Sequence, residues 1–150
     1  MSIEIFIPKH DKNWPDVDHL VREAVLKTLE HVSFEEQTEI SCVLADNDFV
    51  QELNKNYRGK DKPTNVLSFP QDDKTFMNLG DVIFARETIE KEAVTQNKKF
   101  NDHLAHLTVH GTLHLLGYDH EDDDQAEEME GLEIEILNAL NVENPYIDRS

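Results

Sequence analysis

The sequence contains one cysteine, Cys42, among its 150 residues, so the chain can form no internal disulfide and no metal site that needs two cysteines. A lone cysteine is typical of a protein kept in a reducing compartment, and we expect a cytoplasmic location. Long apolar runs are also missing: no stretch approaches 18 apolar residues, and the N-terminal segment lacks a basic stretch followed by an apolar one. We therefore expect neither a membrane-spanning helix nor a secretory leader.

Basic residues are scarce. The chain has 14 Lys and Arg against 32 Asp and Glu, which gives a net charge of −18 at pH 7. Such a charge repels phosphate on average, so it excludes a protein that coats nucleic acid or an anionic membrane by bulk attraction. A nucleic-acid substrate would need a local basic patch. Apolar residues make up 38% of the chain and recur in short periodic groups, which indicates a folded protein rather than a disordered chain.

Glycine and proline are few, at five each, and no linker or repeat indicates a domain boundary, so we expect one domain over residues 1–150. Alternating and β-branched residues predict strands at 2–7, 39–44, 65–69 and 79–85, with a polar hairpin loop at 71–78. Apolar residues at helical spacing predict helices near 17–29, 47–58, 87–97, 102–116 and 124–140. Because strands and helices do not alternate strictly, the order favours an α+β fold with a small mixed four-stranded sheet and about five helices.

Histidine is abundant by contrast. Of eight histidines, five fall within one segment: His103, His106, His110, His114 and His120. His110 and His114 are four residues apart and share one face of the predicted helix, with Cβ atoms about 5–6 Å apart. Gly117 suits a helix end with positive φ, and a turn there can bring His120 back to the same face. Three neutral imidazoles leave one position of a tetrahedral ion open, which is typical of a catalytic rather than a structural zinc site.

This spacing would arise by chance about 0.02 times in a chain with this many histidines. The competing interpretation is a helix whose histidines simply pack or face solvent. His103 and His106 extend the same stripe, and we expect them to support the site, pack or face solvent rather than bind metal, with His106 the better candidate for a supporting role. The other three are expected at the surface: His10, His19 and His31.

The segment at 110–120 reads HGTLHLLGYDH and is similar to the metzincin protease motif HExxHxxGxxH in its three histidines and its glycine. Gly111 stands where the protease has its general-base Glu. A zinc peptidase is therefore the lesser interpretation, unless a carboxylate from elsewhere replaces that Glu.

A positive island interrupts the acidic sequence at residues 55–62, KNYRGKDK. Arg58 could bind phosphate through its planar guanidinium, and Tyr57 offers a surface on which a base could stack. Lys60 and Lys62 would add positive charge beside them. The alternative interpretation is a solvated loop, and charge alone does not distinguish it from a phosphate-binding segment. The island leads into a predicted strand, and loops at sheet ends are where sites are usually built.

Three segments together resemble the YbeY family of bacterial ribosomal-RNA maturation endoribonucleases: LNKNYRGKDKPTNVLSFP at 53–70, LGDVIF at 79–84 and HGTLHLLGYDH at 110–120. The resemblance implies a zincin-like α+β domain and one zinc ion per chain, held by His110, His114 and His120. It further implies cleavage of single-stranded RNA in small-subunit rRNA maturation and ribosome quality control, with the small ribosomal subunit or its proteins as partners. Arg58 would be a catalytic residue beside His114. Asn65 departs from the Asp that the family often has, which puts in doubt a carboxylate role at that position.

Zinc on three histidines would lower the pKa of its water towards about 7 and polarise a phosphoryl oxygen, while Arg58 would bind the charge that develops during cleavage. The residues do not choose between hydrolysis and attack by the ribose 2′-OH. The polar candidates for proton transfer are each more often structural: Asp81, Asp119 and Ser68.

The acidic run at 119–135 is typical of a solvated helix face, in preference to a docking surface for a basic partner. A non-catalytic zinc-binding ribosome assembly factor is the alternative function. An open coordination position would favour the enzyme, and a fourth protein ligand would favour the assembly factor.

Overall fold

The computed structural model describes residues 3–34, 37–71 and 78–146. Within these residues the strands are β1 Ile3–Phe6, β2 Thr38–Ala45, β3 Val66–Pro70 and β4 Asn78–Ala85. The helices are α1 Asp18–His31, α2 Asn47–Arg58, α3 Arg86–Thr95, α4 Phe100–Leu115 and α5 Asp123–Ala139. Every expected strand and helix is present, and the stated ends agree to within two residues. The predicted hairpin loop at 71–78 falls mostly outside the described residues.

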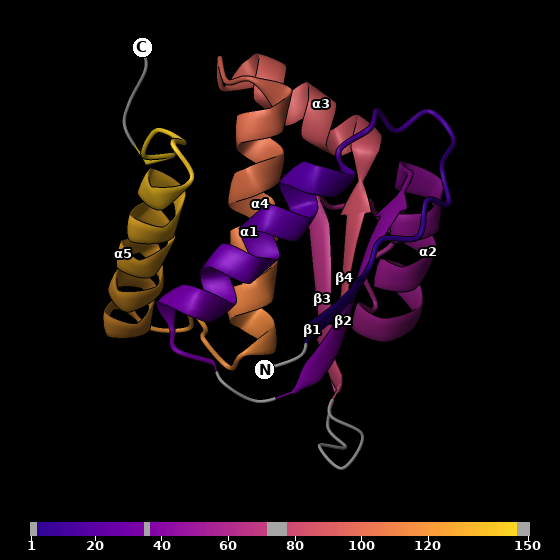
Figure 1. The fold of residues 1–150 in the computed structure, drawn as a ribbon. Helices are drawn as coiled ribbons and strands as arrows, with labels where there is room; N and C mark the ends of the chain where they lie inside the picture. Colours follow the sequence, from indigo (N-terminus) through magenta and orange to yellow (C-terminus); the bar gives the residue numbers. More distant parts are fainter. Residues whose placement is uncertain (1–2, 35–36, 72–77, 147–150) are drawn as a thin grey trace.

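The four strands form one mixed sheet in the order β1-β2-β4-β3 (Figure 1). The β1–β2 and β2–β4 pairs are parallel, and β3 pairs antiparallel with β4, from Val66 opposite Phe84 to Pro70 opposite Gly80. The expected α+β class with a small mixed four-stranded sheet is confirmed. β3 is an edge strand with a neighbour on one side only, and an edge strand tolerates Pro70, which has no backbone N–H to donate.

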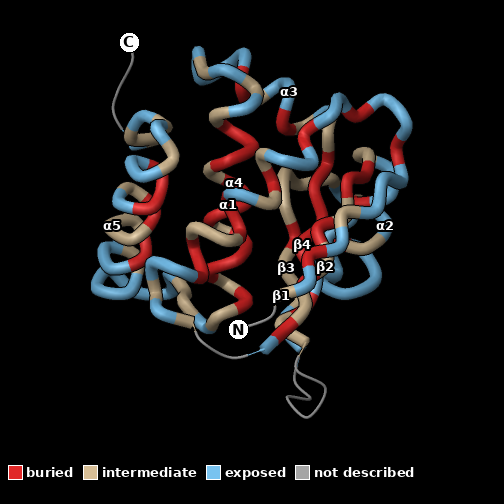
Figure 2. Tube along the Cα trace, in the orientation of Figure 1, coloured by how far each residue is buried: buried red, intermediate tan, exposed pale blue. Residues whose placement is uncertain are grey.

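The two faces of the sheet are covered by different helices. Alternate residues of β4 point in opposite directions, so Val82 and Phe84 pack in the cluster that includes α1 and α4, whereas Ile83 packs with Val50 of α2. Helix α5 lies outside α4, against the side that α4 turns away from the sheet (Figure 1). Helix α4 therefore lies between the sheet and α5, and Figure 2 shows it buried along most of its length.

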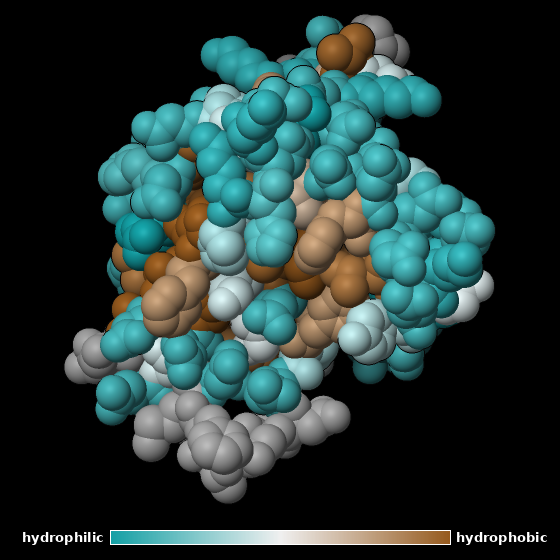
Figure 3. Space-filling view, turned by 90° about the vertical axis from the view of Figure 1, so that its right-hand side faces the viewer, coloured by the Kyte–Doolittle hydropathy of each residue, from teal (hydrophilic) through white to brown (hydrophobic). Residues whose placement is uncertain are grey.

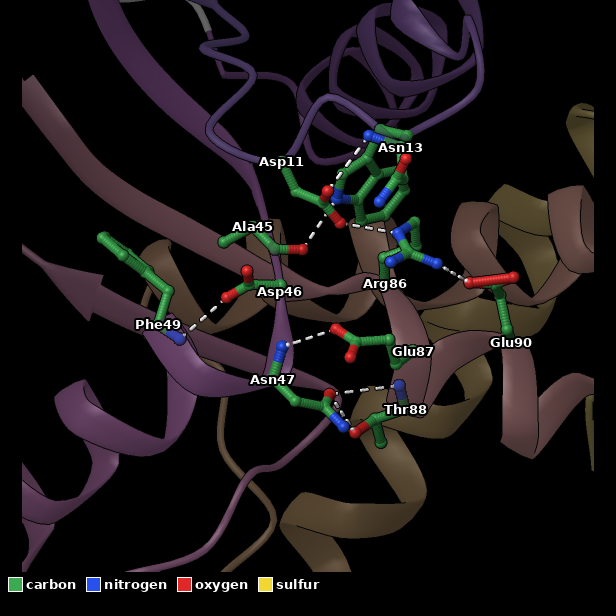
Figure 4. Close-up of polar contacts among 11 residues, drawn as sticks. Asp11, Asn13, Ala45, Asp46, Asn47, Phe49, Arg86, Glu87, Thr88 and Glu90 are labelled. Atoms are coloured by element: carbon green, nitrogen blue, oxygen red, sulfur yellow. Dashed lines mark hydrogen bonds and ion pairs between the residues drawn. The ribbon is translucent and has the colours of Figure 1, made fainter.

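The end of β2 is tied to the start of α3 by polar contacts (Figure 4). Arg86 Nε donates to Asp11 Oδ2 at 2.6 Å, which fastens the loop after β1 to the first residue of α3. The Asn47 side chain accepts from the backbone N–H and the hydroxyl of Thr88. Asp46 caps α2 by accepting from the Phe49 N–H. These contacts hold the amino end of α2 in place, so the position of its carboxyl end is set as well.

Candidate metal centre

Three histidines converge where α4 ends. His110 and His114 lie one turn apart on α4, and their Nε2 atoms are 3.1 Å apart. Gly117 follows the helix with a φ of +100°, and the turn brings the His120 ring to 5.2 Å from that of His114, centroid to centroid. One ligand atom from each of the three residues lies within 4.8 Å of the others, so the cluster could hold one metal ion. The structure thus brings together the three histidines that the sequence singles out.

The donor set suits such an ion. Burial lowers the pKa of His114, and its neighbours His110 and His120 lower it further, so the imidazole is held in the neutral form that binds metal. His110 and His114 are half-buried, while His120 is exposed. Imidazole nitrogens without thiolates favour zinc or another late transition metal.

The cluster borders a cavity of about 580 Å³. One face of β3 lines it through Val66, Ser68 and Pro70, and the segment after α4 contributes Asp119 and Glu121. Arg58 lines it too, although it comes from α2 on the other side of the sheet. Arg58 is the last residue of α2, and Gly59 ends the helix with a φ of +70°, so Arg58 lies at the helix end that borders the cavity.

A second cavity, of about 330 Å³, shares Arg58 and Asn65 with the first. Lys60 and Lys62 line it, and both are exposed. The loop that carries them is held by Asn54, which is buried and whose side chain donates to the Lys62 carbonyl at 2.9 Å. This hydrogen bond indicates that the positive island at residues 55–62 has a defined backbone conformation and is not a freely solvated loop.

Tyr57 lies elsewhere. Its ring packs 5.5 Å from that of Phe69, centroid to centroid, and lines a third cavity, of about 430 Å³, that also contains Asp81. Figure 3 views the side of the molecule on the right of Figure 1, where α2 lies, and shows apolar side chains gathered in the middle of that face. Phe69 and Ser68 point to opposite faces of β3, so Tyr57 and Asp81 are absent from the lining of the metal-site cavity.

Gly111 occupies the position of the protease's general base. A Cβ on this residue would lie 2.7 Å from Cγ1 of Val82 and 3.2 Å from Oγ of Ser68. The position therefore faces the sheet, and a Glu side chain there would have to enter packed β-strand atoms rather than reach the metal. This geometry gives no support to the zinc peptidase interpretation.

His103 and His106 both pair with carboxylates. The His103 Nε2 atom lies 2.9 Å from Glu92, which also accepts from the Asn65 side chain. The His106 Nε2 atom lies 2.9 Å from Glu133 Oε1, and Glu133 Oε2 lies 2.6 Å from Nδ1 of His110. The expectation that His106 has the supporting role agrees with this contact. Of the histidines expected at the surface, His31 binds Glu135 across the α1–α5 contact.

Glu133 is the residue that sequence reasoning missed. The sequence predicts a solvated face for the acidic run at 119–135, and this prediction is wrong for Glu133, which is 0% exposed. Burial by itself would raise the pKa of its carboxyl, but hydrogen bonds from His106 and His110 outweigh burial and lower the pKa to about 2. A signal was available: residue 133 is four residues from both Met129 and Leu137, and so lies on the apolar stripe of α5.

Comparisons with known proteins show which family the chain resembles. The family model described as Endoribonuclease YbeY matches residues 5–141. A protein named Endoribonuclease YbeY from Bradyrhizobium sp. is 49% identical over 90% of this chain and 85% of its own length. A protein of the same name from Parvibaculum lavamentivorans is 46% identical over 97% of this chain and 85% of its own. The solution structure of TM1509 from Thermotoga maritima is 27% identical, covers 91% of each chain and has a TM-score of 0.61.

The family match covers β2, β3, β4 and α4, and with them the three histidines, Gly111 and Arg58. Among the described helices, none is long and apolar enough to cross a membrane. With the matched range, the two close relatives and the architecture in agreement, the chain belongs to the YbeY endoribonuclease family.

Proposed function

We propose that this chain is a single-strand-specific, metal-dependent endoribonuclease that acts in small-subunit rRNA maturation and ribosome quality control. Its metal is one zinc ion, held by His110, His114 and His120, and the whole chain acts as one catalytic domain in the cytoplasm. The observation that carries the proposal is the convergence of three imidazoles and one arginine on a single cavity. The relatives named Endoribonuclease YbeY support the same reaction class.

The cavity suits phosphodiester cleavage. Zinc, when bound, supplies Lewis acidity at a phosphoryl oxygen and acidifies a coordinated water. Arg58 binds the charge that builds on the equatorial oxygens, because its planar fork matches two phosphoryl oxygens at once. His114 holds the metal beside that position. Asp119 and Ser68 line the cavity and are the residues placed to hold a proton there, whereas Asp81 lines the cavity of Tyr57.

The neighbouring basic cavity would hold the flanking RNA backbone. Lys60 and Lys62 line it beside Arg58, so a strand whose scissile phosphate meets Arg58 can place the next phosphate against the lysines. Tyr57 comes directly before Arg58 in the sequence but faces another cavity, so its part in the proposal is to stack a base outside the metal site. A small patch tracks one backbone better than two, which favours single strands.

The acidic charge of the rest of the chain bears on the partner. With a net charge of −18, the protein repels free RNA except at the local patch. RNA presented by the small ribosomal subunit or its proteins would bring the target strand to that patch, and tight binding of free RNA is not required.

Cleavage of single-stranded RNA by intact, chelator-treated and zinc-restored protein tests the proposal. We expect activity to disappear with the metal and to return with zinc, and a His114→Ala preparation made in parallel to be inactive, which excludes a contaminating nuclease. Cleavage that survives complete metal removal would contradict the proposal. Metal-bound protein that binds the small subunit but cuts no RNA would favour the assembly-factor alternative.

A further inference from the structure

Glu133 lies between two histidines of α4 and the C-terminal segment. Its Oε2 atom is 2.6 Å from Nδ1 of His110, and its Oε1 atom is 2.9 Å from Nε2 of His106. The Tyr146 hydroxyl donates to Oε1 as well. An ionised carboxylate only accepts hydrogen bonds, so the hydroxyl and both ring nitrogens are the donors to Glu133.

These contacts decide which nitrogen of His110 carries the proton. A neutral imidazole has one N–H and one lone pair. The N–H of His110 is at Nδ1, bonded to Glu133, so the lone pair is at Nε2. That Nε2 atom is the one that faces Nε2 of His114 at 3.1 Å, within the three-histidine cluster. Glu133 thus selects the tautomer that can bind a metal.

His106 holds the same carboxylate from the other side. Its Nδ1 atom is buried and finds no hydrogen-bond partner among the described residues. A protonated ring would leave an N–H unpaired there, so the ring is neutral and donates through Nε2 alone. Glu133 thus lies against His106 on one side and against His110, a residue of the cluster, on the other.

We infer that Glu133, held in place by His106 and Tyr146, is the positioning residue of the metal centre: its carboxylate holds Nδ1 of His110 and so keeps the ring in the Nδ1–H tautomer, with Nε2 facing the cluster. The inference rests on the part of the proposed function that assigns metal binding to the three histidines, and it does not depend on RNA cleavage. The C-terminal segment thereby becomes part of the metal site, through Tyr146.

A matched control exists on the same helix. His103 pairs with Glu92 through its Nε2 atom at 2.9 Å, and its Nδ1 atom is also buried without a partner among the described residues. The pair has the chemistry of His106 and Glu133, but the hydrogen bonds of Glu92 run to His103 and Asn65 and not to the three clustered histidines. Loss of Glu92 therefore removes a histidine–carboxylate pair of the same chemistry, with a partly exposed carboxylate, and leaves His110 untouched.

The first measurement is zinc affinity, by competition with a chromophoric chelator, for wild type, Glu133→Gln and Glu92→Gln. We expect Glu133→Gln to weaken zinc binding about 10–100-fold, because the amide removes the charge and can satisfy only one of the two rings with its oxygen. Glu92→Gln should stay within about twofold of wild type. Equal losses in the two variants, or no loss in Glu133→Gln, would overturn the inference.

The second measurement uses wild-type protein, so it tests the inference even if Glu133→Gln folds poorly. Long-range ¹H–¹⁵N correlation spectra of metal-free wild-type protein report the tautomer of each histidine. We expect His110 to carry its proton on Nδ1 and to leave Nε2 unprotonated. A His110 ring protonated on Nε2 alone would overturn the inference. Neither readout uses RNA, so absence of nuclease activity with normal zinc binding would refute the proposed function and leave this one standing.

Discussion

The Nε2 atoms of His110 and His114 lie 3.1 Å apart at the end of α4. Two nitrogens bound to one tetrahedral zinc ion at about 2.0–2.1 Å would be about 3.3–3.4 Å apart. The pair therefore already has nearly the separation that one ion demands, and the third histidine, His120, lies on the exposed segment after α4. Folding of the helix already orders two of the three ligands, so metal binding costs little further conformational entropy at these two residues.

The first prediction concerns metal content. His114→Ala should remove most of the bound metal from purified protein, because two remaining imidazoles, one on an exposed loop, bind a divalent ion far more weakly. Elemental analysis measures it, with His19→Ala, an exposed residue of α1, as the control that keeps full occupancy. Full occupancy in His114→Ala would remove His114 from the ligand set.

The second prediction concerns Arg58. Arg58→Ala should keep the fold and the metal, since the residue is exposed at the end of α2, and should lower single-stranded RNA cleavage by about 10²–10³-fold. Arg58→Lys should recover only part, because an ammonium cannot form the bidentate contact. Lys27→Ala on α1 is the matched loss of a positive charge away from the cavity.

An active Arg58→Ala variant would exclude the residue from the mechanism. A fully active Arg58→Lys variant would reduce its part to simple positive charge.

The third prediction concerns the packing of α4 on the sheet. Gly111→Ala should destabilise the protein by about 1–3 kcal/mol, because the added Cβ would lie 2.7 Å from a Val82 methyl group. Gly131→Ala on α5 meets no atom within 4 Å and should stabilise the protein by about 0.5–1 kcal/mol, as expected for alanine in a helix. Urea unfolding measures the change in the free energy of unfolding, which should have opposite signs in the two variants. An unchanged midpoint for Gly111→Ala would mean that Val82 moves aside at no cost.

The fourth prediction concerns RNA binding. Few phosphates can meet the patch formed by Lys55, Arg58, Lys60 and Lys62, so binding should depend only weakly on salt, with a log–log slope no steeper than about −3. Single-stranded RNA should bind and be cleaved in preference to a duplex of the same sequence. Titrations over a salt series measure both; a much steeper slope, or equal cleavage of duplex, would show that a larger surface meets the RNA.

The fifth prediction concerns acid stability. The hydrogen bond from Arg86 holds the pKa of the Asp11 carboxyl below its ordinary value of 3.8 (Figure 4). A lowered native pKa means that the unfolded chain takes up the proton first, so the contribution is complete well above pH 3.8 and is lost as the pH falls through 3.8 and below. Asp11→Asn should cost about 2 kcal/mol at pH 7.

The difference between wild type and Asp11→Asn should shrink as the pH falls from about 5 to about 2. Urea unfolding over this range measures it. A difference that does not change with pH would assign the loss to packing rather than to charge.

Local patterns were enough for much of this protein. The three histidines, the turn at Gly117 and the caps of α2 are set by residues within a few positions of one another, and helical spacing alone places His110 and His114 on one face. The mixed sheet also followed from the order of the elements.

Only the tertiary structure decided which surfaces meet. Glu133 reaches His110 from 23 positions away along the chain, and Tyr146 reaches Glu133 from 13 positions away. Tyr57 and Arg58, although adjacent, line different cavities. Periodicity tells which residues share a face, but the partner of each face is chosen by packing between distant segments. In the sequence, a carboxylate on an apolar stripe cannot be told from the other acidic residues of the run. Only the tertiary structure brings up the histidines whose hydrogen bonds offset the cost of burying it.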